Sequence, residues 1–145
     1  MSEEWEAALA TRLQVAVSRL MRAIRQHGAA GLTPTQISAL ASIKVHGPVR
    51  PSQLATLESI GAPAATRVVA SLEDLGLVQR RDDVADRRAS LVGLTAQGQE
   101  TLDELRHERT AGLSANLAQL TARERTLIEA ALPVLERLAH DEPEE

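Results

Sequence analysis

Apolar residues recur every three or four positions along most of this chain, the spacing that places side chains on one face of an α-helix. The pattern predicts six helices, over about residues 3–26, 34–46, 51–58, 62–75, 95–120 and 121–140. The runs 77–80 and 90–94 fit short β-strands, and the polar residues 81–88 between them predict the tip of a β-hairpin. The expected fold class is mainly α with a small β-hairpin wing.

Local signals fix several of the helix ends. Thr33 with Gln36 three residues later, and Thr121 with Glu124, are capping boxes, in which side chains bond unpaired backbone N–H groups of the first turn. Gly76 follows the fourth predicted helix, where glycine can adopt the left-handed conformation that ends a helix. We therefore expect helix starts at both boxes and a helix end at Gly76.

Residues 51–94 have the order of a winged helix-turn-helix, in which two short helices precede the hairpin. Helical spacing predicts a buried stripe on these helices, formed by Leu54, Ala55, Leu57, Ala65, Val68 or Val69, Leu72 and Leu75. The opposite face of the second helix consists of Pro63, Ala64, Thr66, Arg67 and Ala70. This small-sided face can enter the major groove of DNA, where arginine bonds guanine O6 and N7. For Arg67, a phosphate contact or a solvated position is the alternative.

The hairpin tip carries arginines next to acidic residues. Asp86 and Arg88 are two positions apart, which would put both side chains on one side of an extended strand, with Asp86 orienting Arg88. Arginine is attracted to the negative potential of a narrow minor groove, so we expect Arg88 there. Arg87 would point the opposite way, to phosphate or solvent. A purely structural Asp86–Arg88 pair is the alternative. One of Arg80 and Arg81 would be structural and the other phosphate-facing, and we place Arg81 in the DNA-binding set without a signal that separates the two.

Three further DNA-binding candidates lie at the start of the third predicted helix: Arg50, Ser52 and Gln53. Backbone N–H groups and small polar side chains in a first helical turn commonly meet phosphate. For Ser52 and Gln53, an ordinary solvated helix start explains the same residues.

Taken together, several of these stretches resemble the MarR (multiple antibiotic resistance regulator) family of bacterial transcription factors. The resemblance is carried by Ala-Thr-Arg at 65–67, Leu-Glu-Asp-Leu-Gly-Leu-Val at 72–78, Asp-Arg-Arg at 86–88 and Leu-Thr-Ala-Gln-Gly at 94–98. The flanking helices have the number and order of the family, so the resemblance covers nearly the whole chain. One departure is Ala64, where many members have Ser or Thr, and a hydroxyl contact to DNA is missing at this position.

The resemblance implies a winged helix-turn-helix regulator, usually a repressor, that binds double-stranded DNA as a homodimer. In a single domain spanning the chain, residues 1–28 and 95–140 would be helical dimerisation parts, 33–95 the DNA-binding part and 141–145 a flexible tail. The DNA-binding parts of a dimer would face successive major grooves of a pseudo-palindrome, about 10 bp apart. The first predicted helix has an apolar stripe along its length, so it is either a core helix or, as the resemblance implies, packs its early turns on a second subunit.

Members of the family often release DNA when a small, frequently aromatic and anionic, molecule enters a crevice between the dimer helices and the DNA-binding part. In this chain Arg22, Arg25 and His27 could meet such an anion. The chain has no Tyr or Phe to stack on a ring, so aliphatic residues would line the crevice.

Composition narrows the possible functions. A chain of 145 residues, 43% apolar, suits one domain, and its near lack of aromatic residues requires an aliphatic core. The absence of cysteine excludes disulfides and thiol redox sensing within this chain. No apolar run has the length of a membrane span and the N-terminal residues are acidic, unlike a signal peptide, so we expect a cytoplasmic protein that does not bind membranes.

The net charge of −4 is unevenly distributed. Residues 42–95 carry seven cations and six acidic residues, whereas residues 96–145 carry five cations and eleven acidic residues. The acidity therefore lies outside the predicted DNA-binding part, and the placement of charge governs nucleic-acid binding more than the total.

Other functions have less support in the sequence. With no cysteine, glycine-rich phosphate loop or nucleophile elbow, no catalytic residues are identified, and neither an enzyme nor a bound cofactor is expected. Glu104, His107 and Glu108 share a helix face that could bind metal in a metal-responsive regulator, although a solvated polar face is the simpler explanation. A winged-helix protein-interaction module that does not bind DNA is the other alternative, and Arg67, Arg87 and Arg88 argue against it.

Overall fold

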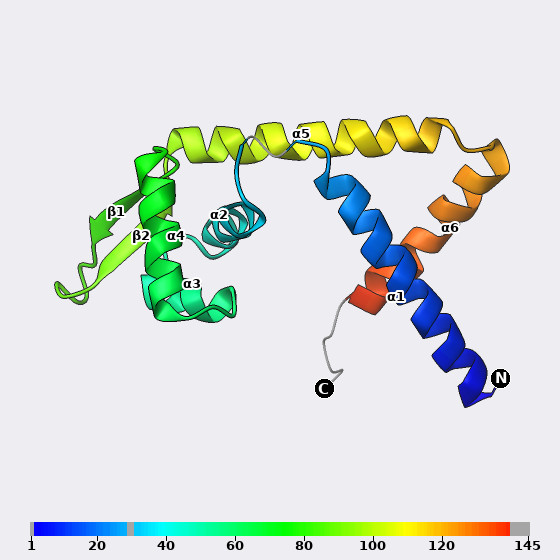
Figure 1. Cartoon of the computed structure of the whole chain (residues 1–145), viewed down its shortest axis with the longest axis horizontal. Coiled ribbons are helices and arrows are strands. Elements are labelled where there is room, and N and C mark those ends of the chain that lie inside the picture. The colour runs from blue at the N-terminus through cyan, green and yellow to red at the C-terminus, as the bar shows by residue number, and fades with distance from the viewer. Residues whose placement is uncertain (1, 29–30, 140–145) are drawn as a thin grey trace. The chain divides into compact units, whose positions relative to one another are not determined.

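A computed structural model describes residues 2–28 and 31–139. Its elements are α1 (Glu3–Arg25), α2 (Pro34–His46), α3 (Pro51–Leu57), α4 (Ala62–Asp74), β1 (Val78–Asp82), β2 (Ser90–Leu94), α5 (Ala96–Ala118) and α6 (Ala122–Ala139) (Figure 1). The predicted fold class is confirmed. The chain divides into two compact units within α5, between Arg109 and Thr110. His140, where the last helix was expected to end, and the tail 141–145 lie outside the described residues.

The helix ends form where the sequence predicts them. At the start of α2, the N–H of Gln36 donates to the Thr33 hydroxyl at 3.2 Å, and the N–H of Thr33 donates to the Gln36 side-chain oxygen at 2.8 Å. Thr121 and Glu124 make the equivalent pair of bonds before α6. Gly76 has φ of 73°, the left-handed conformation expected after α4.

The core of the first unit joins α2, α3 and α4 to the hairpin. Its largest fully buried side chains are Leu40, Ile43, Leu54, Leu72, Val69 and Val92. The prediction of the buried stripe is wrong at two positions, since Leu57 is 42% exposed and Leu75 is 49% exposed. Leu57 is the last residue of α3 and Leu75 is the C-cap of α4, so both lie where their helices leave the core.

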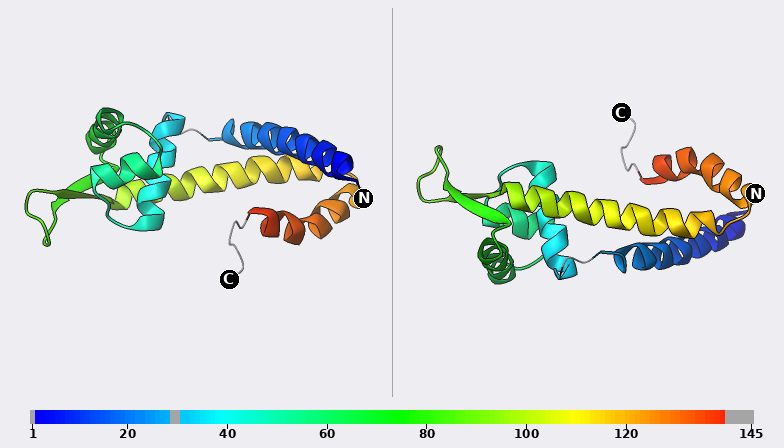
Figure 2. Two further views of the ribbon diagram at one scale, coloured as in Figure 1. Left: turned by 90° about the horizontal axis from the view of Figure 1, so that it is seen from below. Right: turned by 90° about the horizontal axis from the view of Figure 1, so that it is seen from above.

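The hairpin differs from the prediction at its outer end. Its strands are antiparallel, pair Val78 with Leu94 and Asp82 with Ser90, and extend beyond helices α2–α4 (Figures 1 and 2). Arg81 and Asp82 therefore belong to β1 instead of the tip, which is residues 83–89. Val49 adds a bridge on the other side of β2, with bonds of 3.0 and 2.7 Å to Val92.

The first and last helices keep their apolar stripes exposed. Neither α1 nor α6, as far as the structure describes the chain, has a buried residue. The exposed apolar side chains include Trp5, Leu9, Val17, Leu20 and Met21 on α1 and Leu127, Ile128, Leu132, Leu135 and Leu138 on α6. The interpretation of α1 as an ordinary core helix is therefore wrong. Among residues 2–28 and 31–139, no helix combines the length and apolarity needed to cross a membrane.

The start of α5 packs directly on the backbone that leaves α4. The Thr95 hydroxyl donates to the Gly76 carbonyl at 2.6 Å and accepts the N–H of Gly98 at 3.0 Å. A Cβ atom on Gly98 would lie 2.1 Å from the Leu77 carbonyl oxygen, so only glycine fits this buried position without movement of the backbone.

We expect Gly98→Ala to lower the free energy of unfolding by about 1–3 kcal/mol, because the added methyl group overpacks the contact with Leu77. Urea denaturation followed by circular dichroism measures this change. Gly93→Ala is the matched control at a second buried glycine, since its Cβ would meet Pro48 at an ordinary 3.6 Å. Equal effects of the two substitutions would contradict the assignment of this contact.

Candidate nucleic-acid interface

One face of α4 is free of contacts with the core. Ala65, Val69 and Leu72 are buried, whereas Pro63, Thr66, Arg67 and Ala70 are exposed and Ala64 is half-buried. The Thr66 hydroxyl donates to the Ala62 carbonyl at 3.0 Å and so is already bonded within the helix. The exposed face is therefore small-sided, with Arg67 as its one long cation.

The tip of the wing is a turn, and this corrects the predicted strand geometry. The Asp86 carboxylate accepts the backbone N–H of Arg88 at 3.0 Å, and the Asp86 carbonyl accepts the N–H of Ala89 at 3.0 Å. Short acidic side chains commonly bond the backbone two residues on in this way. Asp86 thus shapes the turn through the backbone of Arg88, and the described structure contains no ion pair between their side chains. Arg87 and Arg88 are both exposed.

An ion pair at the base of the tip was missed by the sequence analysis. Arg50 donates from Nε and Nη2 to Oδ2 of Asp83, at 3.1 and 2.7 Å. The Asp83 side chain is 11% exposed and that of Arg50 39%. The structure therefore gives Arg50, a predicted phosphate contact, a partner inside the protein. No local pattern could identify the pair, because its members are 33 residues apart in the sequence.

The bond from Arg50 lowers the pKa of Asp83 below its ordinary value of 3.8, and the N–H of Ala85 contributes in the same direction. A carboxyl group with a lowered pKa in the folded state stabilises that state above its ordinary pKa. This contribution is lost as the pH falls from 3.8 through the lowered value. The Asp83 side chain is therefore a carboxylate at neutral pH.

Arg80 and Arg81, which the sequence does not distinguish, differ in their contacts. Arg80 lies 3.4 Å from Glu73, with both side chains partly exposed, so it has a partner within the protein. Such surface ion pairs contribute little to stability. Arg81 is exposed and has no ion pair with any described residue.

The first turn of α3 presents Ser52 and Gln53 at the surface. The Gln53 side-chain oxygen accepts the N–H of Arg50 at 2.8 Å, so this residue caps the helix. Together with α4 and the wing, the surface has exposed arginines at 67, 81, 87 and 88, whereas Asp83 and Glu73 are paired with cations of their own. Asp82 and Asp86 are exposed beside these arginines, so the surface combines several cations and a small-sided helix face with two acidic residues.

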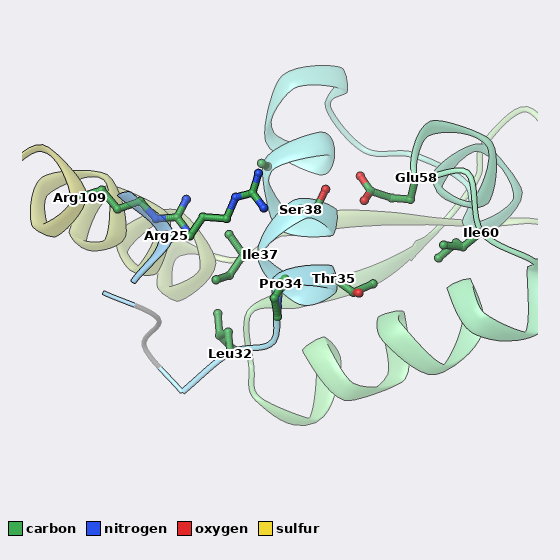
Figure 3. A pocket seen from close by; sticks show the side chains of 10 residues that line it. Arg25, Leu32, Pro34, Thr35, Ile37, Ser38, Glu58, Ile60 and Arg109 are labelled. Carbon is green, nitrogen blue, oxygen red and sulfur yellow. The ribbon is translucent and has the colours of Figure 1, made fainter. Parts of the chain in front are cut away.

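A cavity of about 570 Å³ lies on the first unit, in the size range of small-molecule sites. Its lining residues are Arg25, Leu32, Pro34, Thr35, Ile37, Ser38, Ala41, Glu58, Ile60 and Arg109. In Figure 3, Arg25 and Arg109 lie at one end of the cavity and Glu58 at the other, where Glu58 accepts a bond from the Ser42 hydroxyl. The Nε atom of Arg109 is buried with no hydrogen-bond partner among the described residues.

The predicted ligand residues are only partly brought together. Arg25 lines this cavity, and Arg22 lines a separate hollow along α1 with Arg25 and Met21. His27 lines neither. The sequence analysis did not identify Arg109 as a lining residue, because helical periodicity alone does not show which residues line a cavity.

The metal-responsive alternative has no structural support. Within residues 2–28 and 31–139, no group of three or more His, Asp or Glu side chains could hold a metal ion. Glu104, His107 and Glu108 are exposed on α5 without forming such a group.

Comparisons with known proteins agree with this geometry. The model of the MarR family matches residues 32–90. An HTH-type transcriptional regulator of Mycobacterium bovis is 34% identical over 139 residues, which cover 95% of this chain and 97% of that protein. The HTH-type transcriptional repressor MdtR of Bacillus subtilis is 33% identical over 94 residues, 65% of this chain and 61% of that protein. A Pseudomonas aeruginosa protein named as a transcriptional regulator has a solved structure with a TM-score of 0.81 and 31% identity, over 98% of this chain and 100% of that one.

We expect Arg50→Ala to raise the pKa of Asp83 towards its ordinary value, because the substitution removes the largest cause of the shift. Carbon-detected NMR titration of the aspartate carboxyl groups measures this pKa. Arg81→Ala is the control, since Arg81 makes no ion pair in the described structure and its loss should leave the pKa of Asp83 low. A pKa of Asp83 that is equal in Arg50→Ala and the parent would rule out the pair.

Proposed function

The chain belongs to the MarR family of DNA-binding transcriptional regulators, and we propose that it is a homodimeric repressor that leaves a pseudo-palindromic operator when a small anion binds. The main observation that supports the proposed DNA-binding surface is the set of exposed arginines on α4 and the wing. These cations lie on the exposed face of α4 and on the hairpin that extends beyond it, the arrangement with which winged helix-turn-helix proteins contact both grooves.

Each exposed element has a proposed role. Arg67 contacts base edges in the major groove, with Pro63, Ala64 and Thr66 allowing close approach. Arg88 reaches into the minor groove from the turn that Asp86 shapes, and Arg81 and Arg87 contact phosphate. Ser52 and Gln53 contact phosphate from the first turn of α3.

The proposed homodimer accounts for the exposed apolar faces of α1 and α6. An amphipathic helix with an exposed stripe along its length gains stability from a partner, and monomeric proteins rarely expose such surfaces. The proposed partner is a second copy of this chain, because a pseudo-palindromic operator requires two DNA-binding parts related by two-fold symmetry.

Control by a small molecule is supported by the cavity that Arg25 and Arg109 line. Two guanidinium groups and an aliphatic wall of Leu32, Ile37 and Ile60 suit an anion with an apolar body. The similarity to MdtR, which is named as a repressor, supports repression as the proposed mode of regulation. The ligand would act by binding more tightly to a dimer whose two DNA-binding parts no longer match the operator, and its effect is limited by that difference in affinity.

Selection of bound sequences from random duplex DNA, followed by affinity measurement against salt concentration, tests the function. We expect a pseudo-palindrome with half-sites about one helical turn apart, and affinity that falls steeply with salt. Absence of any enriched sequence, also after unfolding and refolding to remove bound ligand, would favour the protein-interaction alternative. The selected duplex then serves to screen small carboxylates for release.

We expect Arg88→Ala to weaken binding to all duplexes, by about tenfold or more, since the minor-groove contact reads shape more than bases. Arg67→Ala should weaken binding by about 1–3 kcal/mol and relax the preference at one position of each half-site. Repeating the selection with each variant measures both effects. Parent-like affinity and preference in both would refute the assigned surface.

For the dimer, we expect Leu127→Glu to weaken self-association by about 1.5–3 kcal/mol, because a 61% exposed leucine would lose its burial against the second copy. Sedimentation equilibrium measures the dissociation constant. Val45→Glu places the same charge at a 77% exposed apolar position of α2 and should leave association unchanged. A monomeric parent protein would refute the dimer itself.

A further inference from the structure

The Arg50–Asp83 pair connects two parts of the DNA-facing surface. Arg50 directly precedes α3, and Asp83 directly follows β1, where the wing tip begins. We propose that this pair positions the wing: it holds the tip against the start of α3 so that Arg87 and Arg88 are in place before DNA binds. The inference rests on the wing–DNA contacts proposed above and adds a residue pair that acts without touching DNA.

Asp83 joins both sides of the tip to the helix start. Its Oδ2 atom accepts two bonds from Arg50, and its Oδ1 atom accepts the N–H of Ala85 at 3.0 Å. Its own N–H donates to the carbonyl of Ala89 at 3.2 Å, across the tip. The nearly buried carboxylate of Asp83 thus bonds Arg50 to the first residues of the loop, and the backbone N–H of Asp83 joins the two ends of the loop that carries Arg87 and Arg88.

The other partner is held just as firmly. Val49, the residue before Arg50, pairs with Val92 of β2 through both backbone bonds, and the N–H of Arg50 is bonded to Gln53 of α3. The guanidinium therefore extends from backbone that is fixed to both the hairpin and the helix. A tip fixed in this way loses less conformational entropy when it binds DNA, which strengthens binding without any additional contact.

For Asp83→Asn, two explanations predict opposite changes in the affinity for DNA. Removal of a negative charge beside DNA strengthens binding by electrostatics alone. If Arg50 were simply a phosphate contact, freeing it from Asp83 would strengthen binding further. Positioning predicts the reverse, and we expect Asp83→Asn to bind the selected duplex about tenfold more weakly than the parent.

Asp82→Asn is the matched control. Asp82 is the preceding residue, is exposed, and has no ion pair among the residues that the structure describes. Its substitution removes the same charge from nearly the same place, so we expect binding equal to or tighter than that of the parent. Fluorescence anisotropy with the selected duplex and with a scrambled duplex measures both variants.

A second measurement uses the free protein. Relaxation of backbone ¹⁵N nuclei should show increased fast motion for residues 84–89 in Asp83→Asn, with the amides of Val69 and Val92 in the core unchanged. The exchanged pair Arg50→Asp/Asp83→Arg keeps the total charge and should restore most of the affinity and order lost in Asp83→Asn. If Asp83→Asn does not fold, Arg50→Gln carries the same relaxation test.

Weaker binding and a more mobile tip in Asp83→Asn, but not in Asp82→Asn, support the positioning role. Equal affinities for the two variants, or a tip as ordered as in the parent, overturn it. If the parent binds no duplex at all, the proposed function fails, while the relaxation data on the free protein still decide whether the pair orders the wing.

Discussion

The proposed DNA-binding surface depends on a small cluster of aliphatic side chains beneath it. Leu40 of α2, Leu54 of α3, Leu72 of α4 and Val92 of β2 are fully buried together. Interiors of this kind are close-packed, so a change in one side chain displaces its neighbours. The exposed face of α4 and the direction of the hairpin are both set by this packing. Because Val49 pairs with Val92, the same cluster also fixes the backbone next to Arg50, the proposed anchor of the wing.

The features that could be predicted from the sequence are those determined by residues close together in the chain. Two capping boxes and one left-handed glycine mark helix ends correctly, since each uses groups a few positions apart. Periodicity identifies the buried stripe of α4 but extends it to Leu75, because a repeat does not show where the core ends. The turn at Asp86 was missed, since the spacing of two fits a strand and an Asx turn equally well. The Arg50–Asp83 pair required the fold itself, which brings distant residues together.

The two terminal helices differ from the rest of the fold in where their apolar groups lie. Burial in the described chain is concentrated in α2, α3, α4 and the hairpin, whereas α1 and α6 have no buried residue. Burial of apolar surface stabilises a protein by roughly 25 cal/mol per Å², and the exposed stripes of α1 and α6 do not yet contribute this free energy. In a homodimer of the proposed kind, much of the stability would come from association and would depend on protein concentration.

The scarcity of aromatic residues has an optical consequence. The chain has no Phe or Tyr, and its one Trp is Trp5, which is 49% exposed on α1. Intrinsic ultraviolet fluorescence therefore originates from a single indole, on a helix that carries none of the proposed DNA contacts. Indole emission shifts with the polarity of its surroundings, so the colour of that emission reports on whether α1 faces water, with no label attached. Trp5 is therefore an intrinsic fluorescent probe of the exposed face of α1.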